Sequence, residues 1–248
     1  IRDVERSRGL GDVYKRQEYM VVSQNHLATE AGYQILKQGG NAIDAAVGVG
    51  FVLAVTLPRA GNIGGGGFML IYKADSQKVS AIDYRSAAPE SSRSEMYLAD
   101  SGVVRFGHLV NAVPGSVAGL LKAHNEHGKL SLKKVLRPAI KLARNGFPVS
   151  YDLNYILEWG KDSMLINNTS KNKFYDASNN PLSVSSIFKQ PKLAKTLSLI
   201  SNQGKKAFYE GEIADWIVED ALLNGGLITR NDLASYQAKD RLPIETTY

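Results

Sequence analysis

The segment from residue 42 to residue 56 restricts the fold of this chain more than any other. Apolar residues occupy nearly every position of it, so a helix here has no polar face to turn toward water. Such a helix must be covered on most sides, and small residues such as Ala45, Gly48 and Gly50 allow close packing. Asn41 precedes the segment and is a suitable N-cap. The sequence therefore predicts a buried helix over 42–56.

The segments around this helix predict a second helix and antiparallel strands. Apolar residues at helical spacing predict a helix over about 28–37, which Gly39 and Gly40 would end. A short turn over 74–77 predicts that the strands on either side of it form a hairpin. Strands are expected at 19–23, 68–73 and 79–85.

The remainder of the chain is expected to be mainly helical. Pro138 lies inside one predicted helix, where its missing amide predicts a kink or a restart, and Thr229 is expected to cap a further helix. Residues 160–190 are polar and rich in Asn and Ser, so a long surface excursion is expected there. Residues 240–248 resemble a strand without a closing cap, which favours a fragment of a longer protein. Helices are predicted at 115–127, 131–145, 190–201 and 213–223.

Composition argues against several classes of function. The net charge is +6, from 30 Lys and Arg against 24 Asp and Glu, but the cations are dispersed along the sequence. This does not predict a nucleic-acid-binding stripe, and no nucleic acid is expected as a partner. The chain has no cysteine, which excludes disulfides, thiolate metal sites and a cysteine nucleophile. No apolar run reaches the roughly 20 residues that a membrane span needs.

Residues 1–18 are expected to stand apart from the fold. The stretch has no apolar period of either kind and does not continue into the first predicted strand. We interpret it as a non-native or disordered leader, with one domain over 19–248. No signal peptide is visible, so an exported protein would carry one upstream of this chain.

Four consecutive glycines, Gly64–Gly67, separate the apolar helix from the hairpin. Phosphate-binding loops place their glycines after a strand and before a helix, whereas the order here is helix, glycines, strand. The glycines are therefore expected mainly to allow tight packing beside a site, and direct contact with a ligand is the less favoured alternative.

Arg85 lies at the end of the second hairpin strand and is the candidate binding residue. Its guanidinium could hold a carboxylate through two parallel hydrogen bonds. An ion pair with Asp83, two residues earlier on the same strand face, is the alternative, and the residues alone favour it slightly.

No catalytic residue, cofactor or metal is predicted within the chain. The histidines do not form a set, and His124 and His127, near a helix end, are expected to face solvent. No spacing suits a metal site, and no Gly-x-Ser-x-Gly nucleophile motif is present.

Seven segments of the chain form an ordered set of motifs: 39–46 (GGNAIDAA), 60–70 (AGNIGGGGFML), 81–89 (AIDYRSAAP), 113–119 (VPGSVAG), 138–147 (PAIKLARNGF), 208–211 (FYEG) and 225–229 (GGLIT). This set resembles the γ-glutamyltransferase (γ-glutamyltranspeptidase) family and is far more specific than any one motif. The resemblance runs from about Met20 to Tyr248.

The resemblance implies an α+β fold, the αββα sandwich of N-terminal-nucleophile hydrolases, incomplete in this chain. It implies a precursor that cleaves itself, so that a new N-terminal Thr of the small subunit attacks a γ-glutamyl donor such as glutathione. It places the donor's α-carboxylate on Arg85 and the Thr beyond Tyr248. The chain would then be a partial large subunit, inactive alone, of a periplasmic or secreted enzyme.

Two other functions remain open from the sequence. A cephalosporin acylase of the same family would take a glutaryl donor, which lacks the α-amino group. A non-catalytic binding module would keep Arg85 without gaining a nucleophile. Because the sandwich is expected to be incomplete in this chain, an open sheet edge and exposed apolar surface are predicted where the missing part would pack.

Overall fold

The computed structural model describes residues 18–99, 102–103 and 106–246. The expected leader over residues 1–18 lies, except for Glu18, outside this part of the chain. The helices are α2 (His26–Lys37), α3 (Ala42–Thr56), α4 (Ser116–His127), α5 (Leu132–Asn145), α6 (Tyr151–Trp159), α7 (Lys161–Leu165), α8 (Asn168–Phe174), α9 (Pro191–Gln203), α10 (Lys205–Tyr209), α11 (Glu212–Leu223) and α12 (Arg230–Ser235), with 3-10 turns η1 (Ser94–Tyr97) and η2 (His108–Val110). The strands are β1 (Phe68–Lys73), β2 (Lys78–Asp83), β3 (Leu98–Ala99), β4 (Gly102–Val103), β5 (Phe147–Pro148), β6 (Ile187–Phe188) and β7 (Lys239–Arg241).

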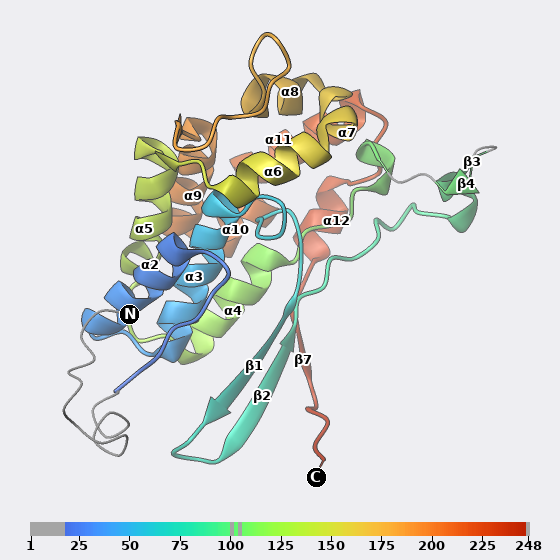
Figure 1. Cartoon of the computed structure of the whole chain (residues 1–248). Helices are drawn as coiled ribbons and strands as arrows, with labels where there is room; N and C mark the ends of the chain where they lie inside the picture. Colours follow the sequence, from blue (N-terminus) through green and yellow to red (C-terminus); the bar gives the residue numbers. More distant parts are fainter. Residues whose placement is uncertain (1–17, 100–101, 104–105, 247–248) are drawn as a thin grey trace.

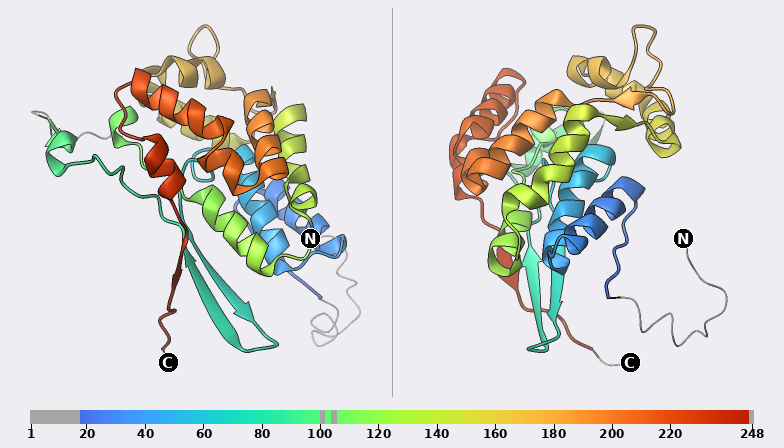
Figure 2. Two further views of the ribbon diagram at one scale, coloured as in Figure 1. Left: turned by 180° about the vertical axis from the view of Figure 1, so that it is seen from behind. Right: turned by 90° about the vertical axis from the view of Figure 1, so that its left-hand side faces the viewer.

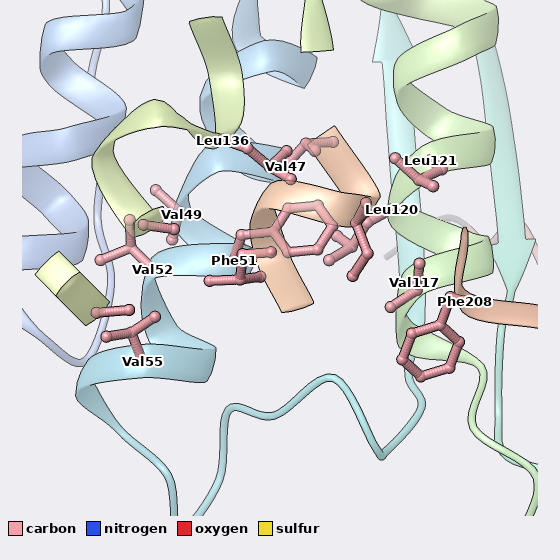
Figure 3. Packing of buried hydrophobic residues seen from close by; sticks show 14 of the residues in the cluster. Val47, Val49, Phe51, Val52, Val55, Val117, Leu120, Leu121, Leu136 and Phe208 are labelled. Carbon is pink, nitrogen blue, oxygen red and sulfur yellow. The ribbon is translucent and has the colours of Figure 1, made fainter. Parts of the chain in front are cut away.

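Helix α3 forms the centre of the helical layer, as its composition predicts. It packs against α2, α4 and α5, and Figure 3 shows Phe51 of α3 beside Leu120 of α4 and Val47 of α3 beside Leu136 of α5. Phe51 and Val52 have no exposed surface. The Asn41 side chain accepts hydrogen bonds from the amides of Ile43 and Asp44, which confirms the predicted N-cap.

The small residues of α3 allow its neighbours to approach closely. A Cβ added to Gly48 would overlap the Cδ1 atom of Ile35 in α2. A Cβ added to Gly50 would lie 3.1 Å from both methyl carbons of Leu120 in α4. Close approach of this kind increases the number of dispersion contacts in the core.

A three-stranded antiparallel sheet in the order β1-β2-β7 lies alongside α4 (Figures 1 and 2). Side chains alternate across β1, so Ile71 is 5% exposed and turns toward the helices. Phe68, Leu70 and Tyr72 turn the other way and are 66%, 72% and 63% exposed. We call these three side chains the outer face of β1. The expected exposed apolar surface is confirmed, and β1 and β7 are the edges of this described sheet.

Two predicted strands differ from the structure. Residues 19–23 form no strand, because they run along α2 instead of beside another strand: the rings of Tyr19 and Tyr33 lie 5.8 Å apart. Of the predicted strand over 240–248, the structure describes residues 240–246, and among these only Asp240 and Arg241 belong to a strand, β7, which pairs with β2.

Two further predictions hold only in part. Residues 160–190 are mostly exposed, as a surface excursion requires, but they contain α7, α8 and β6. Asn167 caps α8 by accepting a hydrogen bond from the Ser170 amide. Helix α5 continues through Pro138 without a restart. Packing of α5 against both α3 and α9 offsets the hydrogen bond that proline cannot donate.

Candidate functional site

Arg85 lies two residues beyond β2, at the rim of a hollow of about 650 Å³. The side chain is exposed, and its guanidinium has no ion pair or hydrogen bond to any residue that the structure describes. Other residues lining the hollow come from β2, β7, α12 and the loop after β2, and include Ser86, Glu90, Asn231, Ser235 and Lys239. An unpaired guanidinium beside such a hollow is available to bind a carboxylate.

The alternative ion pair between Arg85 and Asp83 is not formed. The Asp83 carboxylate instead binds the Arg241 guanidinium, at 2.8 and 2.9 Å, and accepts a hydrogen bond of 3.0 Å from the Arg85 amide. The Arg85 amide and then the Arg241 guanidinium hold the pKa of Asp83 below its ordinary value. Asp83 therefore fixes the backbone of Arg85 and leaves its side chain free.

A pair of stacked tyrosines holds the other side of the Arg85 peptide. The Tyr236 hydroxyl donates a hydrogen bond of 2.7 Å to the Arg85 carbonyl. The Tyr236 ring stacks on Tyr209, with centroids 5.7 Å apart and planes 9° apart. The Tyr209 hydroxyl in turn donates to the Pro114 carbonyl, at 2.8 Å, and accepts from the Ala118 amide, at 3.1 Å. Burial raises the pKa of both hydroxyls, so both stay protonated donors at neutral pH.

Glycines from two motifs make room for the peptide at Arg85. A Cβ added to Gly66 would lie 2.6 Å from the Tyr84 carbonyl oxygen and 2.9 Å from the Arg85 carbonyl carbon. A Cβ added to Gly115 would overlap both the Tyr84 carbonyl and the Tyr236 hydroxyl. By contrast, a Cβ on Gly64 would meet only the Asn62 side chain, at 3.5 Å. The expectation of tight packing is confirmed for Gly66 in particular.

The glycine run also joins β1 to the start of α4. The Gly65 carbonyl accepts hydrogen bonds from the amides of Gly115 and Ser116, at 2.7 and 2.9 Å. These amides lie at the positive N-terminal end of α4, where the helix has free donors. The run therefore presents a carbonyl, and not its amides, to the helix N-terminus, unlike a phosphate-binding loop.

Asp232 connects α12 to the loop that follows Arg85. The Thr229 hydroxyl accepts a hydrogen bond of 3.2 Å from the Asp232 amide, which confirms Thr229 as the cap of α12. In return, the Asp232 carboxylate accepts hydrogen bonds from the Thr229 amide and hydroxyl. It also accepts one from the Glu90 amide, at 2.8 Å. Burial opposes the ionisation of Asp232, but the hydrogen bonds from Thr229 and Glu90 outweigh it and hold its pKa below the ordinary value. Asp232, Tyr209 and Tyr236 support the site and were not predicted from the sequence.

The prediction that His124 and His127 face solvent is wrong. His124 is 9% exposed, with its Nε2 atom 2.9 Å from the Leu130 carbonyl, and the His127 side chain is 12% exposed. The chain folds back over these histidines after α4. The buried Asp44 carboxylate holds this reversal by accepting hydrogen bonds from the amides of Lys129 and Leu130. Among the described residues, no group of three or more His, Cys, Asp or Glu side chains could hold a metal ion.

Comparisons with known proteins identify the family. A family model described as gamma-glutamyltranspeptidase matches residues 28–248. A glutathione hydrolase proenzyme of Escherichia coli (strain K12) is 42% identical over 239 residues, covering 94% of this chain and 41% of that protein. The crystal structure of Helicobacter pylori gamma-glutamyltranspeptidase is 40% identical, with a TM-score of 0.90 over 94% of this chain and 68% of that chain. A cephalosporin acylase from Bacillus halodurans is 27% identical, with a TM-score of 0.79, and the match covers 94% of this chain and 47% of that chain.

The fold is therefore the α+β fold of the N-terminal-nucleophile hydrolases. Within that class, the chain belongs to the gamma-glutamyltranspeptidase family of enzymes. It spans about two fifths of the length of the curated relatives that it matches. No helix among the described residues is long and apolar enough to cross a membrane.

Proposed function

We propose that the protein containing this chain transfers the γ-glutamyl group of glutathione or another γ-glutamyl compound to water or to an amino acid. Relatives with 40–42% identity are named glutathione hydrolase proenzymes, and their similarity extends over 92–94% of this chain. The observation that carries the proposal is the exposed guanidinium of Arg85, which lies at the rim of a hollow and has no partner among the described residues, while its backbone is held at both the amide and the carbonyl.

In this proposal Arg85 binds the α-carboxylate of the donor. A binding residue whose backbone is already fixed contributes more to binding, because less conformational entropy is lost when the ligand arrives. The backbone of Arg85 is fixed on both sides, by Asp83 at its amide and by Tyr236 at its carbonyl. The side chain of Arg85 therefore remains available to bind the donor.

The rest of the catalytic apparatus is proposed to belong to a part of the protein outside this chain. The nucleophile would be the N-terminal Thr of a small subunit, released when a precursor cleaves itself, and its free amine would act as the base. The word proenzyme in the names of relatives supports such processing. The small subunit would cover the outer face of β1, and the enzyme would be periplasmic or secreted, with an upstream signal peptide.

Arg85→Ala tests the site in the protein that contains this chain. Loss of a charge-assisted contact should lower kcat/KM for a γ-glutamyl anilide, mainly through a higher KM. The corresponding loss of transition-state binding free energy should be about 2–4 kcal/mol. Cleavage of the precursor into two subunits should continue, because Arg85 holds the donor and not the scissile bond. Arg59→Ala is a matched control, since it removes a surface arginine whose partner is Asp152. Normal donor kinetics in Arg85→Ala would show that the assignment is wrong.

The similarity to a cephalosporin acylase supports the acylase alternative. A comparison of two substrates distinguishes this alternative from a γ-glutamyl transferase. A glutaryl anilide keeps the carboxylate that Arg85 would bind but lacks the α-amino group. A transferase should prefer the γ-glutamyl anilide, whereas an acylase should prefer the glutaryl compound. A folded, processed protein that turns over neither compound would instead support a non-catalytic binding module.

A further inference from the structure

The face formed by α5 and α9 carries an unbalanced positive charge. Helix α5 contains five Lys or Arg residues and α9 contains two, while neither helix contains Asp or Glu. The two helices pack against each other on the side of the helical layer away from the β1-β2-β7 sheet (Figure 2, right). Lys195 of α9 forms an ion pair with Glu212 and Lys192 lines a different hollow, so the unbalanced charge of this face comes from α5.

Four of these cations line one hollow of about 360 Å³ between α5 and α9. They are Lys133, Arg137, Lys141 and Arg144, at helix positions i, i+4, i+8 and i+11, which share one side of α5 over about 16 Å. All four are exposed, and none forms an ion pair with any residue that the structure describes. The hollow therefore has cations and no carboxylate around its rim.

Helix stability does not account for this arrangement. Like charges four residues apart on a helix repel each other, and a cation in the first turn, such as Lys133, opposes the helix dipole. The apolar side of α5 packs on α3 and α9, and this packing offsets the repulsion between the cations. The packing does not explain why cations occupy these positions. An anion in the hollow would remove the repulsion and neutralise the unpaired charge.

Ser201 provides a second and independent indication of a ligand. It is 8% exposed and lines the hollow, yet its hydroxyl forms no hydrogen bond with the described residues. Ser198, one turn earlier in α9, donates its hydroxyl to the Ala194 carbonyl at 2.7 Å, as serines in helices commonly do. The Ser201 hydroxyl thus has no acceptor among the described residues, and an anion in the hollow could accept its hydrogen.

We propose that this hollow binds the phosphate group of an anionic ligand. Arg137 and Arg144 offer planar guanidinium groups that can each hold two phosphate oxygens, while Lys133 and Lys141 add point charges. Ser201 donates its hydroxyl to a further oxygen. The ligand is either a soluble phosphorylated compound or the headgroup of an anionic lipid, and both present the same phosphate chemistry.

Binding is measured on the mature protein with two probes, inorganic phosphate by calorimetry and phosphatidylglycerol vesicles by co-sedimentation, both in chloride buffer. Arg137→Ala with Arg144→Ala should weaken binding by about tenfold or more, and Ser201→Ala by a smaller factor. Lys73→Ala with Lys78→Ala is the matched control, because it removes two cations from the β1–β2 hairpin. Hydrolysis of a γ-glutamyl donor should be unchanged in all of these variants.

The outcomes separate the two sources of phosphate. Binding of inorganic phosphate without vesicle binding identifies a soluble ligand, and vesicle binding that phosphate displaces identifies a lipid headgroup. Three results would overturn the proposal: no binding of either probe, an equal loss in the hairpin control, or binding of a DNA oligonucleotide alone. The last result would identify a surface that attracts any polyanion and not a phosphate site.

Discussion

Phe51 and Phe68 are the same residue type in opposite surroundings. Phe51 has no exposed surface and lies in α3, inside the helical layer, whereas Phe68 begins β1 and is 66% exposed. Helix α3 therefore buries most of its large apolar side chains with this chain alone. The outer face of β1 does not, although its side chains are as apolar as those of the core. We infer that the two regions depend differently on the remainder of the longer protein.

The largest expected effect separates these two phenylalanines. Phe51→Ala should lower the free energy of unfolding of this chain by about 3–5 kcal/mol, because it leaves a cavity in a closed core. Phe68→Ala should change it by no more than about 0.5 kcal/mol, because the side chain gains little from folding. Denaturant unfolding of the two variants measures both values, and similar losses would contradict the comparison. A large loss for Phe68→Ala only in the longer protein would show that its outer face is covered there.

A second pair of substitutions tests the glycine run. Gly66→Ala should lower the free energy of unfolding by about 1–3 kcal/mol. The added Cβ would overlap backbone atoms of Tyr84 and Arg85, and a backbone cannot shift as easily as the end of a side chain. Donor binding should weaken with it, since the same peptide carries the guanidinium. Gly64→Ala, whose Cβ meets only the end of the Asn62 side chain, should change little and serves as the control. Equal effects at both positions in unfolding and donor assays would show that packing does not explain the run.

Local patterns were sufficient to predict the parts of the fold that depend on neighbours in sequence. The apolar composition of 42–56 predicted a buried helix, the turn over 74–77 predicted the β1–β2 hairpin, and Asn41 and Thr229 were found as caps. These features follow from periodicity and from side-chain contacts within three residues, so the sequence alone contains their cause.

The support of the site depends on contacts that no local pattern reveals. Tyr236 reaches Arg85 across 151 residues, and Asp232 reaches Glu90 across 142. Tyr236 stands in no distinctive local pattern. Asp232 belongs to the capping box of α12, but that pattern does not reveal its bond to Glu90. His124 is covered by a chain reversal that the buried Asp44 organises. The position of Arg85 was predicted, but the reason why its side chain is free of Asp83 required the pairing of β2 with β7.

Tyr236→Phe measures the contribution of the hydrogen bond between Tyr236 and Arg85, which has the larger sequence separation of the two. It removes a hydrogen bond to the Arg85 carbonyl while keeping the ring stacked on Tyr209, so the free energy of unfolding should fall by only about 0.5–1.5 kcal/mol. In the longer protein, KM for a γ-glutamyl donor should rise several-fold with kcat little changed, since the hydroxyl positions the binding residue. A purely structural role predicts the stability loss without the change in KM, and Phe208→Leu gives a stability-matched control.

The smallest effect concerns Asp83 and should appear as a dependence on pH. Its pKa lies below the ordinary value of 3.8, chiefly because its carboxylate accepts the Arg85 amide and then because it binds Arg241. A lowered pKa means that ionised Asp83 stabilises the fold above about pH 4 and that this stabilisation is lost as pH falls through the lowered pKa. Asp83→Asn should therefore be slightly less stable than the parent chain at pH 7, and the two should converge in acid. Denaturation midpoints from pH 7 down to the acid range measure the difference. A constant gap across that range would show that the ionised carboxylate contributes nothing, and that the Arg85 amide needs only a neutral acceptor.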